Sequence, residues 1–222
     1  LLSPGQTFYI DDIQIIELGN TLNLDASGIR PTTWYDATHA ITGTNTSVTP
    51  VIPPSSELQA MDFNGSTSAI AYTGMDGLTG DVSFVGWMYL RSFGESGDGI
   101  LFASGGISLR VDLATPTTSA LLATRDGANA SYSTANSIGT NRWIFFAWTD
   151  TGGTSKFWLG DLSTAPTNKT QDSSAGTPTS GTTWYVGSNN GAYTFDGILS
   201  PIRIYSRVLS SQEITDLYNK EK

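Results

Sequence analysis

The stretch that decides the fold lies near the C-terminus, where residues 195–210 read FDGILSPIRIYSRVLS. Residues 195–205 form a run typical of a β-strand. Ser210-Ser211-Gln212-Glu213 then matches a capping box, in which the Ser210 hydroxyl accepts from the Glu213 amide and the Glu213 carboxylate reaches back. Ile214, Leu217 and Tyr218 follow at i, i+3 and i+4. This spacing predicts a short helix whose apolar stripe docks on the sheets.

Working outward from this stretch, residues 58–205 are a series of short β-type runs separated by turn signals roughly every 8–12 residues, a spacing typical of a sandwich or barrel. Residues 81–91 and 143–148 are apolar on both faces, which predicts central strands. We expect the faces that carry Phe84, Met88, Phe145 and Ile204 to meet in one core. Residues 163–182 read as an exposed loop with at most one edge strand. Hairpin-type dipeptides separate several runs: Asp76-Gly77, Asp98-Gly99, Gly105-Gly106, Asp126-Gly127 and Gly152-Gly153.

Composition excludes several functional classes. The 222 residues contain no cysteine and one histidine, which excludes disulfide scaffolds, thiol catalysis and cysteine-ligated zinc. The net charge of −9 predicts that neither nucleic acid nor an anionic membrane surface is a partner, because both would require a basic patch. The sequence has no apolar run long enough for a transmembrane helix, so membrane insertion is not expected.

Two stretches resemble the laminin G-like, concanavalin A-like lectin/glucanase superfamily. Residues 58–68 (LQAMDFNGSTS) are similar to the opening strand and turn of its bacterial and phage members. Residues 184–189 (WYVGSN) and 195–210 resemble its closing strands, which end in an R-I-Y-x-R-x-L-S corner and a short helix. The resemblance covers roughly residues 31–222 and implies an antiparallel β-sandwich of the jelly-roll type. The closing motif is specific for the fold and not for a ligand.

The N-terminal part is interpreted separately. Residues 8–18 read as a strand that resembles the last strand of a carbohydrate-binding jelly roll. We therefore expect residues 1–18 to close a preceding β domain or to be an N-terminal extension, and residues 19–222 to form the laminin G-like domain. The chain begins Leu1-Leu2-Ser3-Pro4 without an initiator Met, so it is expected to be part of a larger polypeptide.

The sequence predicts that the protein is not an enzyme. Glucanases of the superfamily carry an E-x-D-x-x-E strand, whose alternate carboxylates share one face at the separation that a glycosidase needs. None of the five glutamates belongs to such a motif: Glu17, Glu57, Glu95, Glu213 and Glu221. The single histidine, His39, has no serine or aspartate at motif spacing.

Calcium is frequent in the family, so the resemblance implies a candidate structural calcium site. Asp62, Asn64 and Asp196 adjoin glycine turns in the opening and closing strands, which the topology would bring together at a sheet edge. Calcium takes six to eight oxygen ligands, usually carboxylates and carbonyls. The alternative is that Asp and Asn before Gly only form turns.

Glycan recognition needs exposed aromatic faces beside short polar side chains, since a ring stacks on the apolar face of a sugar while amides bind its hydroxyls. Trp184 and Trp158 alternate with polar neighbours, and Tyr193 ends the loop Asn189-Asn190-Gly191-Ala192-Tyr193. We predict that these three aromatic residues, with Asn189 and Asn190, contact a glycan. The alternative is that each ring covers an edge of the sandwich.

These patterns leave three functions open. The first is a non-catalytic carbohydrate-binding or adhesion module of a multidomain surface, secreted or virion protein, whose partner is a polysaccharide or cell-surface sugar. The second is a structural or interaction domain, such as a virion decoration or spacer. The third is a glycan-active hydrolase or lyase without the familiar motif. Aromatic residues beside Asn-rich loops favour the first over the second, and the missing carboxylate motif disfavours the third.

Overall fold

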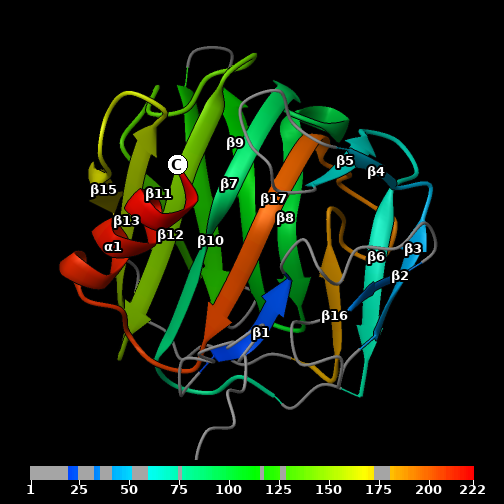
Figure 1. Ribbon diagram of the computed structural model, residues 1–222, viewed down its shortest axis with the longest axis horizontal. Coiled ribbons are helices and arrows are strands. Elements are labelled where there is room, and N and C mark those ends of the chain that lie inside the picture. Colours follow the sequence, from blue (N-terminus) through cyan, green and yellow to red (C-terminus); the bar gives the residue numbers. More distant parts are fainter. Residues whose placement is uncertain are drawn as a thin grey trace, which may run out of the picture.

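The computed structural model describes residues 20–24, 33–35, 42–51, 60–74, 77–115, 118–125, 129–172 and 181–222. Over these ranges the chain forms two antiparallel β-sheets and a C-terminal helix, which confirms the predicted all-β sandwich (Figure 1). Residues 1–18, which were expected to close a preceding β domain or to be an N-terminal extension, lie outside the described residues, and so does His39. No helix in the described part of the chain combines the length and apolarity that crossing a membrane requires.

The first sheet has eight described strands. β1 (Asn20–Leu24) and β5 (Ala60–Asn64) pair with the two halves of β17 (Asp196–Tyr205), at Ile202–Tyr205 and Asp196–Leu199 respectively. The long β7 (Val82–Ser92) lies between β12 (Trp143–Thr151) and β17. The order of the other strands is β14 (Thr167–Asn168), β13 (Thr154–Asp161), β12 (Trp143–Thr151), β7 (Val82–Ser92), β17 (Asp196–Tyr205), β5 (Ala60–Asn64) and β4 (Thr49–Val51).

The second sheet has nine described strands and faces the first. A short 3₁₀ turn, η2 (Glu95–Gly97), leads from β7 of the first sheet into β8 (Asp98–Ser104) of the second. The order is β15 (Thr170–Asp172), β11 (Asn129–Ser133), β10 (Thr118–Arg125), β9 (Ile107–Thr115), β8 (Asp98–Ser104), β16 (Thr183–Val186), β6 (Ala69–Thr73), β3 (Thr42–Thr46) and β2 (Thr33–Tyr35).

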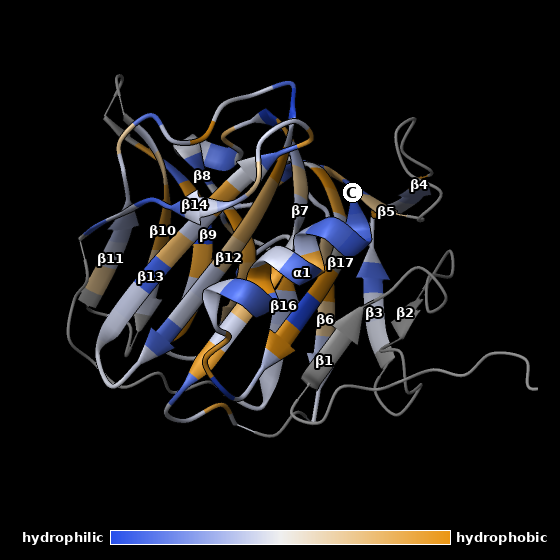
Figure 2. Ribbon diagram, turned by 60° about the vertical axis from the view of Figure 1, so that its left-hand side comes forward, coloured by the Kyte–Doolittle hydropathy of each residue, from blue (hydrophilic) through white to orange (hydrophobic). Residues whose placement is uncertain are grey.

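The main core lies between the sheets. Phe84 is packed against Phe102 of the opposite sheet, with ring centroids 4.8 Å apart, and against Trp148 at 5.2 Å. Met88 and Ile204 belong to the same buried cluster, as predicted. Strands β7, β12 and β17 carry apolar side chains along their length, visible as orange bands in Figure 2. Burial of these side chains from both sheets provides the main favourable term for folding.

A second apolar cluster lies on the outer face of the first sheet, and it corrects one sequence expectation. Phe145 belongs to this outer cluster with Val85 and Trp87, and not to the inner core. Its neighbours Ile144 and Phe146 face inward, because successive strand residues point to opposite faces. Residues 143–148 are apolar on both faces, so the sequence alone could not show whether the odd-numbered or the even-numbered residues face the second sheet.

Helix α1 (Ser211–Glu221) covers the outer cluster (Figure 1). Ser210 caps it as predicted: the Glu213 amide donates to the Ser210 hydroxyl at 3.3 Å, and the Ser210 amide donates to the Glu213 carboxylate at 2.7 Å. The Tyr218 ring stacks on Trp87 at 5.6 Å, and its hydroxyl donates to the carbonyl of Asp161 at 2.8 Å. The helix therefore also fixes the end of β13.

One edge of each sheet is formed by a short strand from the same segment. Residues 163–172 contain two short strands, β14 and β15, at the corresponding edges of the two sheets, where the sequence predicted a loop with at most one strand.

In β17 the register shifts between Ser200 and Arg203. Pro201 lies in this shift, where a residue without an amide proton leaves no ladder hydrogen bond unmade.

Candidate functional site

The predicted glycan-contacting loop, residues 188–194, connects β16 to β17 and forms a tight turn. Asn189 and Ala192 exchange backbone hydrogen bonds of 2.8 and 3.1 Å, and the Gly191 amide donates to the buried Ser188 hydroxyl at 3.3 Å. Asn190 and Tyr193 have positive φ angles of 52° and 54°. Left-handed backbone is uncommon for a residue with a bulky side chain, so Tyr193 is held in this conformation by its surroundings.

The backbone around Tyr193 is tied to the rest of the sandwich. The Tyr193 carbonyl accepts from the Ile100 amide at 2.9 Å, and the Thr194 carbonyl accepts from the Glu95 backbone amide at 3.1 Å. Phe195 is fully buried, and its amide donates to the carbonyl of Gly187 at 2.9 Å. Tyr193 is nevertheless 44% exposed, and Asn189 and Asn190 are exposed beside it. The loop thus presents an aromatic face and two amides on a fixed backbone, the groups that bind the apolar face and the hydroxyls of a sugar.

The two tryptophans of the predicted set are not part of this surface. Trp184 has no exposed area, its ring meets Phe102 edge-on at 5.4 Å, and its indole nitrogen donates to the Gly181 carbonyl at 3.1 Å. Its ring therefore has no face for a ligand, which corrects the prediction for this residue. Trp158 lies on β13 of the other sheet and packs, partly buried, against the outer cluster beneath α1. The alternation that suggested exposure instead reflects strands with one buried face.

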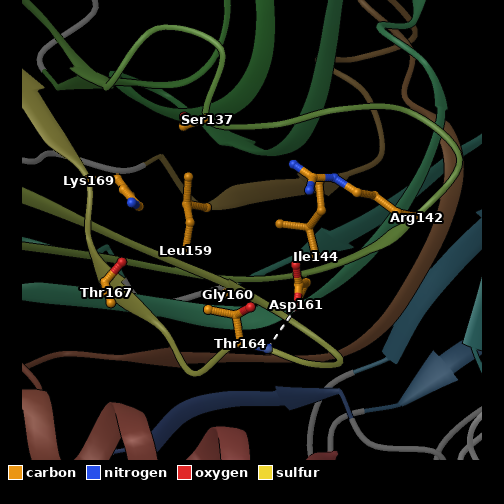
Figure 3. Close-up of a pocket in the computed structure, with 9 residues that line it drawn as sticks. All are labelled: Ser137, Arg142, Ile144, Leu159, Gly160, Asp161, Thr164, Thr167 and Lys169. Atoms are coloured by element: carbon orange, nitrogen blue, oxygen red, sulfur yellow. Dashed lines mark hydrogen bonds between the residues drawn. The ribbon is translucent and has the colours of Figure 1, made fainter.

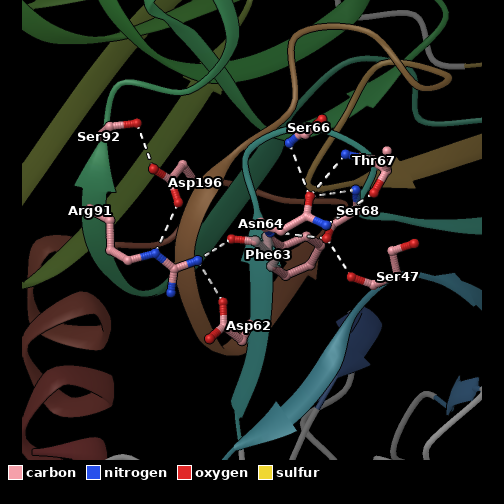
Figure 4. Close-up of polar contacts among 10 residues, drawn as sticks. All are labelled: Ser47, Asp62, Phe63, Asn64, Ser66, Thr67, Ser68, Arg91, Ser92 and Asp196. Atoms are coloured by element: carbon pink, nitrogen blue, oxygen red, sulfur yellow. Dashed lines mark hydrogen bonds and ion pairs between the residues drawn. The ribbon is translucent and has the colours of Figure 1, made fainter.

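The topology does bring the predicted calcium ligands together. Asn64 and Asp196 are cross-strand partners, and Asp62 pairs with Ile198 on the same two strands. Arg91 lies between the two carboxylates, with its guanidinium 2.6 Å from Asp62 and 2.9 Å from Asp196 (Figure 4). The same group donates to the Phe63 carbonyl, and Ser92 donates to Asp196 at 2.6 Å. The hydrogen bond and charge of Asp62, followed by those of Asp196, raise the pKa of Arg91.

As they stand, these side chains do not fit a calcium ion. The Asn64 side-chain oxygen already accepts from the amides of Ser66, Thr67 and Ser68 at 3.0, 2.9 and 3.1 Å (Figure 4). Within the described ranges no three histidine, cysteine or acidic residues are grouped as metal ligands would be. Calcium binding by Asp62, Asn64 and Asp196 stays a prediction, and it now carries a condition: the guanidinium would have to leave.

A second pair of acidic residues lies on neighbouring strands of the second sheet. Asp98 on β8 and Asp112 on β9 are cross-strand partners, and Arg110 lies 3.3 Å from the Asp98 carboxylate. Asp112 is only 5% exposed. Burial, followed by the charge of Asp98, raises the pKa of the Asp112 carboxyl, while Arg110 acts in the opposite direction. With so little exposed surface, Asp112 offers no access to a sugar substrate, so this pair does not form an open acid–base site.

Sequence reasoning missed a grooved surface at the end of the sandwich where β7 ends. Two pockets adjoin there, and both have Arg142 and Asp161 in their walls. One opens over Tyr89 and Trp143 on the outer face of the first sheet. The other, at the edge of the sandwich, has Lys169 among its lining residues (Figure 3). The signal available in the sequence was Leu162, an apolar residue in a polar loop, which is 41% exposed.

Comparison with known families gives a match for most of the chain. Residues 63–215 match the family model described as the concanavalin A-like lectin/glucanases superfamily. The matched range includes both stretches that carry the resemblance except the first residues of the opening strand. No curated protein matches the sequence.

Solved structures share the fold at low sequence identity. The chain is 18% identical, with a TM-score of 0.64, to domain 4 of AbnA, an extracellular GH43 arabinanase from Geobacillus stearothermophilus in complex with arabinotriose; the match covers 90% of this chain and 98% of that one. It is 14% identical, with a TM-score of 0.65, to the binding domain of Paraclostridial Mosquitocidal Protein 1, over 91% of this chain and 52% of that one. It is also 14% identical, with a TM-score of 0.62, to the binding domain of botulinum neurotoxin serotype G, over 90% of this chain and 51% of that one.

These likenesses establish the fold. The chain spans about half the length of the two toxin domains and nearly all of the arabinanase domain. The named neighbours are domains of larger proteins, among them an extracellular enzyme and two toxins. One of these domains was solved with an oligosaccharide bound.

Proposed function

This chain belongs to the concanavalin A-like lectin/glucanase superfamily, and we propose that it is a non-catalytic carbohydrate-binding or adhesion module. In this proposal it is part of a larger surface, secreted or virion protein, and its partner is a polysaccharide or a cell-surface sugar. The module binds through the loop of residues 188–194.

The observation that carries this proposal is the presentation of Tyr193. The ring is among the most exposed large apolar side chains of the described residues, and its backbone is left-handed and hydrogen-bonded on both sides. A ring held in this way loses little conformational freedom when a ligand stacks on it, which favours affinity. The exposed side chains of Asn189 and Asn190 supply donors and acceptors within the same turn.

The neighbours support the glycan class of ligand without specifying the sugar. An arabinanase domain of the same fold, which this chain covers almost completely, was solved with arabinotriose. Neutral or weakly charged glycans suit most of this surface, because the net charge of −9 repels polyanions at modest salt. We expect weak affinity, as an open turn with one exposed ring buries little of a ligand.

The alternatives differ in what they require. A structural or spacer domain requires no strained aromatic at a loop tip, so its surface would tolerate loss of the Tyr193 ring in every assay. A typical glycoside hydrolase requires two accessible carboxylates at the separation of a glycosidase pair. The paired aspartates on β8 and β9 include Asp112, which is buried. Both alternatives are therefore less well supported than binding.

A glycan array with the wild-type chain, with and without calcium, tests the proposal and identifies a ligand. Titration of that ligand into Tyr193→Ala should then show a Kd about tenfold or more above that of the wild type, since stacking of a ring on an aromatic side chain contributes of the order of 1–3 kcal/mol. Tyr193→Phe is the matched control, because it keeps the ring and should retain binding. Asn190→Gly keeps the left-handed backbone, removes the amide and should weaken binding several-fold.

Two results would contradict the proposal. The first is an array without any glycan bound, which would favour the structural alternative. The second is full retention of binding by Tyr193→Ala, which would show that this loop is not the contact surface.

A further inference from the structure

The two pockets around Arg142 and Asp161 form one grooved surface, which we call the Arg142 groove. The pocket on the outer face has a volume of about 320 Å³ and the one at the sandwich edge about 160 Å³. The larger is within the range of ligand sites, which begins at about 300 Å³. The Arg142 groove shares no lining residue with the loop that carries Tyr193.

Two cationic side chains distinguish this groove from the rest of the acidic surface. Arg142 and Lys169 line the smaller pocket from opposite sides (Figure 3). Neither forms an ion pair with any residue that the structure describes. The other arginines with described side chains are all paired with carboxylates: Arg91, Arg110, Arg203 and Arg207. Two cations beside the single carboxylate of Asp161 leave these walls with a net positive charge, which attracts an anion.

The larger pocket adds an aromatic wall. Tyr89 and Trp143 are cross-strand partners whose rings meet edge-on at 5.7 Å, and both are only partly buried. Leu162 lines the same pocket and is 41% exposed. These apolar groups can pack against the ring of a sugar, while Asn141 and Ser163 in the same wall offer hydrogen-bonding groups.

The loops that build the groove are held by hydrogen bonds. The Asn141 amide donates to the carbonyl of Leu90 on β7 at 2.7 Å, and the Lys169 amide donates to the carbonyl of Phe157 on β13 at 2.7 Å. Gly160 lies so close to the loop that an added Cβ would be 2.7 Å from the Thr164 carbonyl. The site is therefore largely formed before a ligand binds, which reduces the entropic cost of binding.

Asp161 completes the wall and limits the ligand charge. Its Oδ1 accepts from the Ser163 amide, the Ser163 hydroxyl and the Thr164 amide at 2.8, 2.7 and 2.8 Å. The Ser163 hydroxyl and amide lower the pKa of this carboxyl, so it is ionised at neutral pH. One fixed negative charge beside two cations favours a singly charged ligand over a phosphate dianion.

We propose that the Arg142 groove binds a carboxylate-bearing sugar residue, with the carboxylate between Arg142 and Lys169 and the sugar ring against Trp143 and Leu162. A planar guanidinium matches a carboxylate in a bidentate contact, which an ammonium alone does not provide. The ligand is thus a uronic or sialic acid residue of a glycan. This inference rests on the proposed function and deepens it, because it names an acidic sugar at a second position on the surface.

Titration calorimetry with galacturonate oligosaccharides and with sialyllactose tests the inference and separates the two sources of carboxylate. The same compounds with the carboxyl reduced to an alcohol are the ligand controls. We expect Arg142→Gln and Lys169→Gln each to raise the Kd of the acidic compound about tenfold, the size of one charge-assisted contact, and to leave the neutral compound unaffected. Lys156→Gln is the matched control, since Lys156 is an exposed cation on β13 outside the groove.

A second readout locates the ligand. The indole NH resonance of Trp143 should shift on addition of the acidic compound in the wild type and not in Arg142→Gln. The inference is overturned if neither acidic compound binds, if the reduced compounds bind equally well, or if both charge variants bind like the wild type. The proposed function fails separately, through retention of neutral-glycan binding by Tyr193→Ala, because that experiment uses a neutral ligand and a surface that shares no residue with the groove.

Discussion

Trp184 and Tyr193 lie nine residues apart in the sequence and belong to different parts of the molecule. Trp184 is on β16, has no exposed surface and contacts the core from the second sheet. Tyr193 is at the end of the next loop and is 44% exposed. The sequence placed both in one glycan-contacting set. The difference separates a framework, whose changes should alter stability, from a presented loop, whose changes should alter binding.

The physical reason lies in the backbone of each segment. β16 alternates partly buried and buried positions, so every second side chain on it enters the core. The loop that follows turns through left-handed residues at Asn190, Gly191 and Tyr193, and this conformation directs the tyrosine to solvent. Polar neighbours in sequence therefore indicate a half-buried strand in the first case and a surface turn in the second.

The largest expected effect is loss of stability in Trp184→Ala. Removing this ring leaves a cavity beside Phe102 and takes away one of the two donors to the Gly181 carbonyl, so the free energy of unfolding should fall by about 3–5 kcal/mol. Urea or thermal unfolding measures this. Tyr185→Ala is the control on the opposite face of the same strand and should cost much less. Similar costs for the two variants would break the assignment of Trp184 to the framework.

Arg91 tests the framework just beyond the loop, where Asp196 begins β17. Arg91→Gln removes both ion pairs and leaves two carboxylates close together, so the free energy of unfolding should fall by about 1–2 kcal/mol, between the values for exposed and buried pairs. The same variant opens Asp62 and Asp196 to a cation. Calcium should therefore raise the melting temperature of Arg91→Gln more than that of the wild type.

Melting curves in calcium and in excess chelator check this second expectation. A ligand that binds only the folded state raises the melting temperature by mass action. If chelator instead lowered the melting temperature of the wild type, the guanidinium must yield to the metal, and the calcium prediction from the sequence would be supported over the ion-pair geometry.

Asp112 gives a smaller, pH-dependent effect within the framework. Its pKa is raised in the folded state, so the folded form favours the protonated carboxyl. The stabilisation is fully present below the unfolded pKa of about 3.9 and is lost as the pH rises through the folded pKa. Asp112→Asn should therefore gain stability relative to the wild type as the pH rises from acid to neutral, by less than the change in Arg91→Gln. A stability difference independent of pH would contradict the burial of an ionised Asp112.

The smallest stability effect is expected at Tyr193, where the comparison is sharpest. Tyr193→Gly removes the ring and relieves the left-handed conformation, so the free energy of unfolding should stay within about 0.5 kcal/mol of the wild-type value. Glycan binding should nevertheless be lost as in Tyr193→Ala. A large loss of stability would place Tyr193 in the framework with Trp184.

Much of the fold could be predicted from sequence because its signals are local. The capping box at Ser210 needs only four consecutive residues, and both of its hydrogen bonds are present. The central position of β7 followed from a run that is apolar on both faces. The meeting of Asp62 and Asp196 followed from the family's order of strands, and the structure pairs their strands.

The sites were harder to predict, because they combine residues far apart in sequence. Arg91 reaches Asp62 and Asp196 from a third strand. The acidic residues near the turns indicate a cation site, but they do not show that the guanidinium of Arg91 already lies between the two carboxylates. Arg142 and Lys169 belong to separate loops, and nothing local marks them as neighbours. Their position follows from the pairing of β12 with β13 and from the path of the chain between the sheets.

The sequence by itself determined the β-sandwich, the terminal helix and the exposure of the Tyr193 loop, since period, turn chemistry and capping act over a few residues. Tertiary structure alone decided which face of each strand became interior, that Trp184 is core, that Phe145 supports the helix, and which charged side chains face each other. Both faces of the central strands are apolar, so only the pairing of the two sheets and the docking of α1 select between them. Long-range contacts fix side chains that local preference leaves equivalent.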